Sequence, residues 1–394
     1  MNIAVVTREI APLTKNGGIG TAVHGLCEEL TSRGHTLTVY YTGRPEWSMW
    51  AFAAEMRKHD MRFKPIVSLP GLLLRDPVRR CRKAHAVLSR TRHDVYIFHE
   101  FMADGLFCLR AHRQEGAFAH SRLGVVTHGS ALWVDEGNGC VAHDGKRRHL
   151  YAMEQKCCEL ADFVVSPSQY LIGWMRDKGW HLPEATHCIP NFIPSPEKQL
   201  PEIATQTGNL EIVFFGRLEE RKGVRVFCEA LTHLPHALYA GLRVTFLGKE
   251  AGFRPEDMRA MLRRPLEAGL RLTFLADYGP QEALAYLRAG HRLAVMPSLR
   301  ENSPCTVAEC LEAGIPFLAS SVGGGRELAH AGDRAMSFCA PEAPVLAERL
   351  RDVLQGGSLP KARPAYTREE LGALWQELLR DQTARKPLPT KSAE

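Results

Sequence analysis

The segment that most constrains the fold joins a short apolar run to an amphipathic helix through a polar loop. Leu293–Met296 is an apolar run of strand length, and the proline after it ends the strand. Ser303 and Pro304 are typical of a helix start. A serine hydroxyl can accept a hydrogen bond from an unpaired backbone N–H of the first turn, and the N–H that proline lacks would have no partner there. Gly314 is typical of a helix end. We expect a helix from about Pro304 to Ala313.

The same alternation of strand and helix recurs along the chain. Other apolar runs also lead into turns and helical patterns: Asn2–Val6, Asp94–Glu100, Leu123–Thr127, Glu211–Phe215 and Leu272–Leu275. Strands that alternate with helices predict an α/β fold, in which helices cover both faces of a parallel sheet. The 394 residues suffice for two domains. We find no internal repeat.

Two glutamates, Glu301 and Glu309, lie eight positions apart around the expected helix start. A helix N-terminus exposes N–H groups and the positive end of the dipole, which favours a phosphate. A carboxylate beside a phosphate would be repelled, so we expect Glu301 to face a neutral polyhydroxylated group such as a sugar. The alternative is that Glu301 is a solvent-facing loop residue and Glu309 a surface helix residue.

A second polar cluster follows the run Glu211–Phe215, in the sequence GRLEERKG. Arg217 and Lys222 therefore stand at the carboxyl end of a strand, where open α/β sheets bind ligands. Both side chains suit phosphate oxygens. Because the charges of 219–221 are interleaved with them, a solvated charged turn is the alternative.

Together, GRLEERKG and ENSPCTVAE resemble the motifs of the retaining GT-B glycosyltransferases of family 4. In that family a strand, a G-R-x-x-x-x-K-G turn and a distant E-x7-E motif form the nucleotide-sugar site. The following GGGREL resembles the family's GG-x-x-E-L ending. The resemblance implies two Rossmann-like parallel-sheet domains that face a central cleft, with a C-terminal helix crossing back to the N-terminal domain.

The resemblance also implies roles in donor binding. Glu309 would bind the ribose hydroxyls, and Glu301 would hold the transferred sugar through positioning and electrostatics rather than as a nucleophile. Arg217, Lys222 and the first N–H groups of the helix would stabilise the diphosphate. The other donor-binding residues that we expect are Gly17, Gly18, Tyr278, Asn302, Ser303, Cys305, Thr306 and Val307.

Candidate residues on the acceptor side follow two strands of the amino-terminal half. His128 follows Leu123–Thr127; a lone histidine after a strand is usually structural, but the family places one here beside the donor sugar. We therefore expect His128 to be catalytic together with Glu301. His99 and Glu100 end another strand, and we expect them to contact the acceptor at the cleft edge. Trp133, with Asp135 and Asn138, is expected in a loop that covers the acceptor.

The chain divides where proline and polar residues replace the periodic pattern. We expect an acceptor-side domain at 1–190, a linker at 191–209 and a nucleotide-sugar domain at 210–365. An amphipathic crossover helix is expected within 366–382, because Thr367–Arg380 has suitable caps and spacing. A disordered tail is expected at 383–394.

Cysteine and histidine usage points to no metal or disulfide chemistry. The eleven cysteines form no C-x-x-C pair and no secretory signal opens the chain, so we expect reduced thiols and a cytoplasmic protein. The seventeen histidines show no metal-binding spacing, and no D-x-D motif occurs. We therefore expect a metal-independent enzyme without a cofactor.

The net charge of +6 is modest, but basic residues are dense from Arg75 to Arg92. This segment is expected to touch anionic lipid headgroups at the membrane; a solvated helix face or a site for an acidic acceptor are the alternatives. No apolar run approaches the roughly 20 residues of a spanning helix. No nucleic-acid motif is present.

These observations predict a retaining hexosyltransferase with a nucleotide diphosphate sugar as donor, UDP-linked because such donors are commonest in the resembled family. The acceptor hydroxyl would belong to a saccharide, a lipid-linked sugar or a small molecule, in the synthesis of a bacterial glycan, glycolipid or natural product. Two alternatives share the fold. One is a nucleotide-sugar 2-epimerase, with Glu301 and His128 as acid and base; the other is a non-catalytic sugar-nucleotide-binding subunit.

Overall fold

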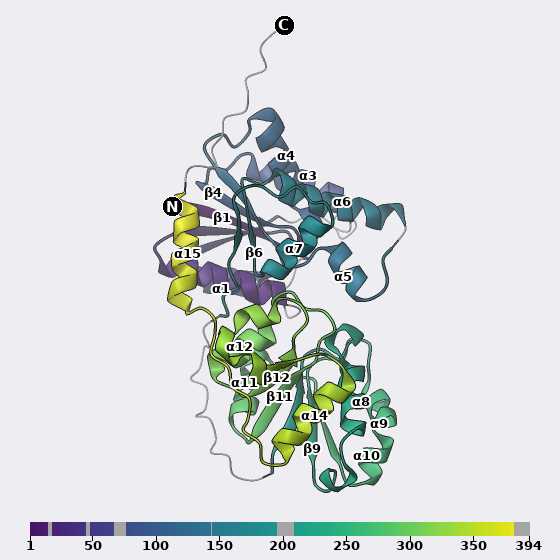
Figure 1. The fold of residues 1–394 in the computed structure, drawn as a ribbon. Coiled ribbons are helices and arrows are strands. Elements are labelled where there is room, and N and C mark those ends of the chain that lie inside the picture. The colour runs from purple at the N-terminus through teal and green to yellow at the C-terminus, as the bar shows by residue number, and fades with distance from the viewer. Residues whose placement is uncertain (15–17, 45–47, 67–75, 143, 195–208, 382–394) are drawn as a thin grey trace. The chain divides into compact units, whose positions relative to one another are not determined.

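The computed structural model describes residues 1–14, 18–44, 48–66, 76–142, 144–194 and 209–381. The chain forms two compact units (Figure 1). The first comprises Met1–Pro194 and Arg368–Glu394, and the second comprises Ser195–Thr367. The expected linker falls largely, and the expected tail entirely, outside the described residues.

The first unit is a seven-stranded parallel sheet with the order β3-β2-β1-β4-β5-β6-β7. Its strands are β1 (Asn2–Thr7), β2 (Thr36–Tyr41), β3 (Met61–Pro65), β4 (Val95–His99), β5 (Arg122–Val126), β6 (Phe163–Ser166) and β7 (Thr186–Cys188). Its helices are α1 (Gly18–Ser32), α2 (Met49–Lys58), α3 (Pro77–Leu88), η2 (Phe101–Ala103), α4 (Leu106–Glu115), α5 (Ala131–Gly137), α6 (Gly145–Leu160), α7 (Gln169–Asp177) and α15 (Arg368–Arg380).

The last helix, α15, packs on the first unit although the whole second unit precedes it in the chain. Its apolar face, including Leu371 and Trp375, joins the core formed by β1 and α1. Arg368 donates to Glu29 of α1 over 2.7 Å, and the two helices lie side by side in Figure 1. The C-terminal helix therefore returns to the amino-terminal unit, as the predicted fold class requires.

The second unit is a six-stranded parallel sheet with the order β10-β9-β8-β11-β12-β13. Its strands are β8 (Glu211–Phe215), β9 (Arg243–Leu247), β10 (Arg271–Leu275), β11 (Arg292–Met296), β12 (Phe317–Ser320) and β13 (Phe338–Cys339). Its helices are η3 (Glu220–Lys222), α8 (Val224–Thr232), η4 (His236–Leu238), α9 (Pro255–Met261), α10 (Arg263–Glu267), α11 (Pro280–Arg288), α12 (Cys305–Ala313), η5 (Gly324–Leu328), η6 (Ala331–Asp333), α13 (Arg334–Ser337) and α14 (Ala343–Leu354).

Each sheet has a point at which the strand order changes direction. In the first unit β1 pairs with β2 on one side and β4 on the other; in the second, β8 pairs with β9 and β11. The crossovers on either side of such a point diverge and leave a crevice at the carboxyl ends of the strands. The turn after β8 and the loop after β11 are therefore neighbours, although about eighty residues separate them in sequence. The predicted α/β fold with two parallel-sheet domains is confirmed.

Helix starts differ from the prediction in detail. Helix α1 begins at Gly18, one of the two glycines that we expected to contact the donor. Helix α12 begins at Cys305, and Pro304, with extended φ and ψ of −69° and 117°, takes the cap position that we had assigned to Ser303. The extended conformation of Pro304 fixes the direction in which the loop from Glu301 enters the helix.

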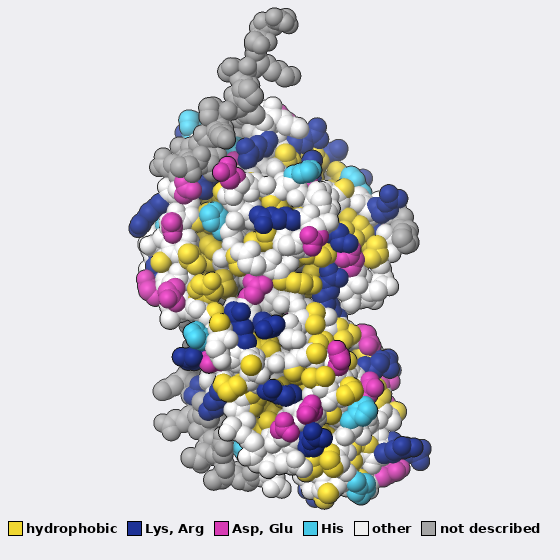
Figure 2. Space-filling model, viewed as in Figure 1, with side chains coloured by type: hydrophobic (Ala, Val, Ile, Leu, Met, Phe, Trp, Pro, Cys, Tyr) yellow, Lys and Arg dark blue, Asp and Glu magenta, His cyan; other side chains and the backbone are white. Residues whose placement is uncertain are grey.

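The prediction that the basic residues from Arg75 to Arg92 form an exposed surface is wrong for Arg80. Arg80 is only 3% exposed, because its Nε donates to Asp104 over 2.9 Å. Arg75 lies outside the described residues. Lys and Arg side chains are dispersed among apolar and acidic ones on the face shown in Figure 2. No helix in the described part of the chain has the length and hydropathy to cross a membrane.

Candidate active site

The loop after β8 reaches the end of β11 because a glycine permits it. Gly223 has a φ of 76°, and a Cβ there would lie 2.0 Å from the carbonyl oxygen of Pro297. Only a residue without a side chain allows this approach and this backbone conformation. As a result, the turn that carries Lys222 closes onto the loop that carries Glu301.

Glu301 is the centre of a charged network in the second unit. Lys222 Nζ forms a very short ion pair with its Oε1, and Arg221 Nη1 lies 3.4 Å from the same oxygen. Arg221 also donates to the Arg300 carbonyl over 3.0 Å and to Glu219 over 2.9 Å. The interpretation of this segment as a solvated charged turn is therefore wrong for Lys222 and Arg221, whose side chains are largely buried.

Arg217, the other cation of the motif, lies at the outer end of this network. Its Nη2 donates to Glu219 Oε1 over 3.0 Å, and its side chain is half-exposed. Glu219 thus bridges Arg217 and Arg221. The alternating charges lead from the protein surface to the buried carboxylate of Glu301.

The environment of Glu301 keeps its carboxylate ionised. The residue is only 8% exposed, and burial alone would raise its pKa. The charges of Lys222 and Arg221, together with hydrogen bonds from Lys222 and Ser298, outweigh burial and lower the pKa below its ordinary value. The alternative of a solvent-facing loop residue is therefore wrong.

The segment GGGREL positions the backbone of Glu301. Gly323 has a φ of 85°, and a Cβ on it would lie 2.0 Å from the Glu301 carbonyl oxygen. Gly324 N–H donates to that same oxygen over 3.2 Å. The glycines after β12 thus hold the loop after β11 in place.

Glu309, on α12, is in the opposite electrostatic state. It is 9% exposed, so it is not a surface helix residue, yet among the described residues its carboxylate forms no hydrogen bond or ion pair. Burial, with a smaller contribution from the charge of Glu312, raises its pKa to about 7, while the charge of Lys222 opposes the shift. A buried carboxylate without a protein partner is suited to hydroxyl donors from a ligand.

The start of α12 provides fewer N–H groups than we predicted. Val307 N–H already donates to the Pro304 carbonyl over 3.1 Å. Thr306 N–H makes no hydrogen bond within the described part of the chain. Burial raises the pKa of the Cys305 thiol to about 12, so this side chain is neutral. Thr306 is therefore an N–H donor that an anion could use at this helix start.

Three other expected donor-binding residues differ in burial and in their position relative to Glu301. Asn302 is buried next to Glu301, and Ser303 is partly exposed before α12. Tyr278 follows β10, which β9 separates from β8, and packs edge-to-face on Tyr286 with ring centroids 5.9 Å apart. No contact among the described residues joins Tyr278 to the Glu301 network.

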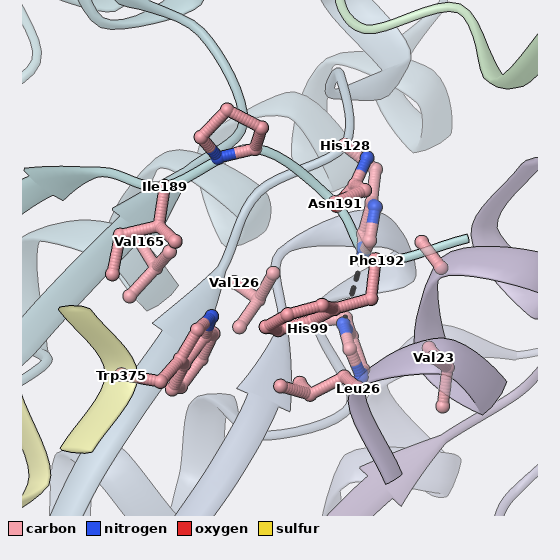
Figure 3. Close-up of a pocket in the computed structure, with 12 residues that line it drawn as sticks. Val23, Leu26, His99, Val126, His128, Val165, Ile189, Asn191, Phe192 and Trp375 are labelled. Carbon is pink, nitrogen blue, oxygen red and sulfur yellow. Dashed lines mark hydrogen bonds between the residues drawn. The ribbon is translucent and has the colours of Figure 1, made fainter. Parts of the chain in front are cut away.

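In the first unit, His99 and His128 meet at the carboxyl ends of neighbouring strands. His99 ends β4, which pairs with β5, and His128 follows β5. His99 Nδ1 and His128 Nε2 are 2.8 Å apart, in a largely apolar pocket that Figure 3 shows. Burial lowers the pKa of His128 to about 4 and that of His99 well below its ordinary value, so both rings are neutral at pH 7. Of the expected glycine contacts, Gly17 lies outside the described residues and Gly18 begins α1.

The prediction that Glu100 contacts the acceptor at a cleft edge is wrong. Glu100 is 1% exposed, and its Oε1 accepts the backbone N–H groups of His128 and Gly129, each over 2.6 Å. Burial nevertheless raises its pKa to about 7. Glu100 therefore fixes the backbone that carries His128.

The loop that we expected to cover the acceptor is also wrong. Ser130 caps a helix by accepting from Trp133 N–H over 3.3 Å, so Trp133 lies in α5. Its side chain is 3% exposed and belongs to the core of the first unit. Asp135 is bound by Arg147 over 2.7 and 2.8 Å. These contacts stabilise the domain.

Sequence reasoning missed Arg221 and Ser298 as neighbours of Glu301. Arg221 occupies a variable position of the motif, and only the turn of η3 directs it toward the carboxylate. In the described residues, no group of three or more His, Cys, Asp or Glu side chains could hold a metal ion; metal independence stays a prediction.

Comparison with known proteins assigns both halves of the chain. Residues 16–195 match the Glycosyltransferase Family 4 model, and residues 196–370 match the model of Glycosyl transferases group 1. The chain has the GT-B fold of the glycosyltransferases. It superposes on sucrose-phosphate synthase from Thermosynechococcus elongatus with a TM-score of 0.68 at 18% identity, covering 96% of both chains. HepE from Anabaena, in complex with UDP and glucose, gives 0.62 at 16% identity over 96% of this GT-B chain and 95% of HepE.

A curated relative matches more closely in sequence but over a shorter length. Glycogen synthase from Mycobacterium tuberculosis is 31% identical over 227 residues, which are 57% of this chain and 53% of that protein. The match therefore spans about half the length of the relative. The structural neighbours, at identities below 20%, show the fold alone.

Proposed function

We propose that this GT-B chain is a retaining glycosyltransferase that moves a sugar from a nucleotide diphosphate sugar, UDP-linked in the first instance, to an acceptor hydroxyl. The observation that carries the proposal is that the site contains two buried glutamates, of which one has its charge neutralised by cations and the other has no partner among the described residues. Glu301 is bound by Lys222 and Arg221, whereas Glu309 is buried without a partner among the described residues. The two therefore suit different parts of one donor.

The charges at the end of β8 suit a leaving diphosphate. In the reaction the bond between the anomeric carbon and the diphosphate oxygen breaks, and the leaving group gains negative charge. Lys222 has three N–H donors, so it can bind a phosphate oxygen while it remains paired with Glu301. Arg217 and Thr306 N–H add donors at the same edge of the sheet. Such preorganised donors are usually the largest single contribution to catalysis.

Glu301 is suited to positioning and not to nucleophilic attack. A carboxylate with a lowered pKa is a weak base and a weak nucleophile, because its negative charge is already stabilised by two cations. We therefore propose that the configuration at the anomeric carbon is retained through a same-face displacement. The acceptor oxygen bonds to the anomeric carbon on the side that the diphosphate leaves, and the acceptor proton passes to the departing phosphate.

Glu309 is assigned to the ribose hydroxyls. Its unpartnered carboxylate has a pKa raised to about 7, and two hydroxyl donors would supply the hydrogen bonds that it lacks. We assign to His128 the role that the family resemblance implies, beside the transferred sugar. His128 is neutral at pH 7 because its pKa is lowered to about 4.

The printed descriptions of the neighbours guide the choice of donors to test. HepE is described in complex with UDP-glucose, and starch synthase IV from Arabidopsis thaliana as bound to ADP and acarbose, with a TM-score of 0.59 at 13% identity. UDP-sugars and ADP-sugars are therefore the first candidates. Acceptors would be saccharides, lipid-linked sugars or small molecules. The proposal also includes that the enzyme acts without a metal ion. It further places the enzyme at the cytoplasmic face of a membrane, which exposed basic residues of 76–92 would contact.

Proton NMR of the purified protein with a panel of nucleotide sugars and EDTA tests the proposal. We expect slow release of nucleotide and an α-configured sugar from one α-linked donor, and loss of this activity in Glu301→Gln. Inversion at the second carbon of the sugar would establish a 2-epimerase instead. Nucleotide binding without turnover of any donor, with saccharide acceptors present, would contradict the proposal and favour a binding subunit.

A further inference from the structure

The histidine pair of the first unit is held in one geometry from two directions. Glu100 fixes the backbone of His128 through two 2.6 Å hydrogen bonds, and His99 contacts its ring. Figure 3 shows the two rings joined by the hydrogen bond, with Val126, Phe192 and Trp375 lining the same pocket. The ring centroids are 4.9 Å apart. Side-chain packing and backbone hydrogen bonds thus leave His128 little freedom to turn.

The contact between the two rings requires one proton between the two facing nitrogens. His99 Nδ1 and His128 Nε2 are 2.8 Å apart, so one nitrogen donates and the other accepts. Burial disfavours a second proton, because it lowers the pKa of both rings. Two arrangements remain: either His99 donates from Nδ1, or His128 donates from Nε2.

The far nitrogen of His99 distinguishes these arrangements. His99 Nε2 is buried and has no hydrogen-bond partner among the described residues. If His128 donates, His99 must carry its proton on Nε2, and this N–H would be a buried donor without an acceptor. If His99 donates from Nδ1, Nε2 retains only an unused lone pair. Buried donors without a partner are the rarer of the two, so the second arrangement is favoured.

We propose that His99 is a positioning residue that donates its Nδ1–H to His128 Nε2 and thereby fixes the His128 tautomer with its proton on Nδ1. The consequence for catalysis rests on the proposed function. With Nε2 occupied by His99, His128 carries its proton on Nδ1 and can act there only as a hydrogen-bond donor. It does not take the acceptor proton, which agrees with transfer of that proton to the departing phosphate. The same tautomer removes His128 Nε2 as an acid or base for epimerisation.

Long-range proton–nitrogen NMR of the free protein, labelled with ¹⁵N-histidine, tests this assignment at pH 7. His99→Asn and His128→Asn identify the two rings among the seventeen histidines. We expect a protonated Nδ1 and a bare Nε2 in both rings. A protonated Nε2 in His128 would overturn the proposal.

Two substitutions of His99 separate positioning from simple packing. Asparagine places an amide N–H near the position of Nδ1–H, so His99→Asn should keep the His128 tautomer. His99→Phe retains an aromatic ring but no donor, and His128 should then populate the tautomer protonated on Nε2. We expect kcat to fall about tenfold in His99→Phe and by less than threefold in His99→Asn, with KM for the donor little changed. Equal His128 tautomers in both variants would contradict the positioning role.

The tautomer is measured without substrate, so its outcome is independent of the proposed reaction. A protein with the expected tautomer that turns over no nucleotide sugar would contradict the proposed function and leave the positioning role intact. Circular dichroism checks that the variants fold. If His99→Phe does not fold, the wild-type spectrum and His99→Asn still decide the assignment.

Discussion

The carboxyl ends of the two sheets use buried carboxylates in different ways. In the first unit, Glu100 and Glu154 accept backbone N–H groups. Glu154 binds those of Met102 and Ala131 over 2.9 and 2.7 Å. In the second unit, Glu301 binds two cations. The first arrangement fixes loops, whereas the second concentrates charge.

This difference appears in the ionisation of the groups. Burial raises the pKa of Glu100 to about 7 and that of Glu154 to about 8, and the neighbouring histidines are neutral. In the second unit, Lys222 and Arg221 keep the pKa of Glu301 low. A neutral, tightly packed edge suits the orientation of a sugar, and a charged edge suits a diphosphate. Replacing a charged side chain by a neutral one should therefore affect catalysis far more in the second unit than in the first.

The largest effect is expected for Lys222→Met. The variant removes the ammonium that faces both Glu301 and the proposed diphosphate. Loss of one such donor typically costs about 2.7 to 4 kcal/mol, so kcat/KM for the donor should fall about 100- to 1000-fold in a steady-state assay. Arg225→Met, which removes an exposed cation on the next helix, is the matched control. Similar losses in both variants would show that overall charge, and not this site, controls turnover.

Glu309→Gln should change both nucleotide affinity and the pH dependence of stability. Because the folded-state pKa of Glu309 is raised from 4.5 to about 7, the folded protein binds more protons than the unfolded chain between these values. The contribution of Glu309 to the wild-type free energy of unfolding should therefore fall as pH rises through this window. The glutamine variant lacks this loss and should be more stable than the wild type at pH 8, by at most about 3 kcal/mol.

At pH 4 the two proteins should be equally stable, because the glutamate is protonated in both states. Denaturant unfolding at pH 4 and pH 8 measures the difference. Calorimetry at pH 8 should show nucleoside diphosphate binding weakened by roughly tenfold, which corresponds to about 1.4 kcal/mol. Unchanged affinity would remove Glu309 from the ribose site.

Arg221→Met should have an intermediate effect. Glu301 loses one of its two cations, so its pKa should rise, and the acid limb of the pH profile of kcat/KM should move to higher pH. We expect a roughly tenfold loss of activity at pH 7, about 1.4 kcal/mol. Arg221→Lys keeps the charge but lacks the guanidinium fork that binds Glu219 and the Arg300 carbonyl. An acid limb that stays at the same pH in the methionine variant would exclude coupling to Glu301.

The smallest effect on turnover is expected for Glu100→Gln. The amide oxygen can accept the same two N–H groups, and the buried carboxylate charge disappears. Because the pKa of Glu100 is raised to about 7, the contribution of this residue to stability falls as pH rises from 4.5 to 7. The variant lacks this loss and should be the more stable protein at pH 8. Glu100→Ala, without an acceptor, should lose roughly 1 to 3 kcal/mol. A large loss of turnover in the folded glutamine variant would return Glu100 to the acceptor site.

The sequence predicted elements better than side-chain environments. The strand and helix around Glu301 were predictable because an apolar run, prolines and Gly314 mark them locally. The burial of Lys222 was not, because it depends on the positive φ of Gly223 and on the approach to Pro297. Trp133 was misplaced because the cap signal of Ser130 was overlooked. The role of Glu100 depends on N–H groups that only the folded chain brings to it.

Parallel measurement of turnover and nucleotide affinity in Glu301→Gln tests the central claim most directly. Donor turnover is followed by NMR, and UDP or ADP binding by calorimetry, on the same preparation. If Glu301 positions the transferred sugar, turnover should fall at least about 100-fold while the Kd for the nucleotide changes less than threefold, because Lys222 remains available to the diphosphate. Wild-type turnover, or a parallel loss of affinity and turnover, would contradict the account.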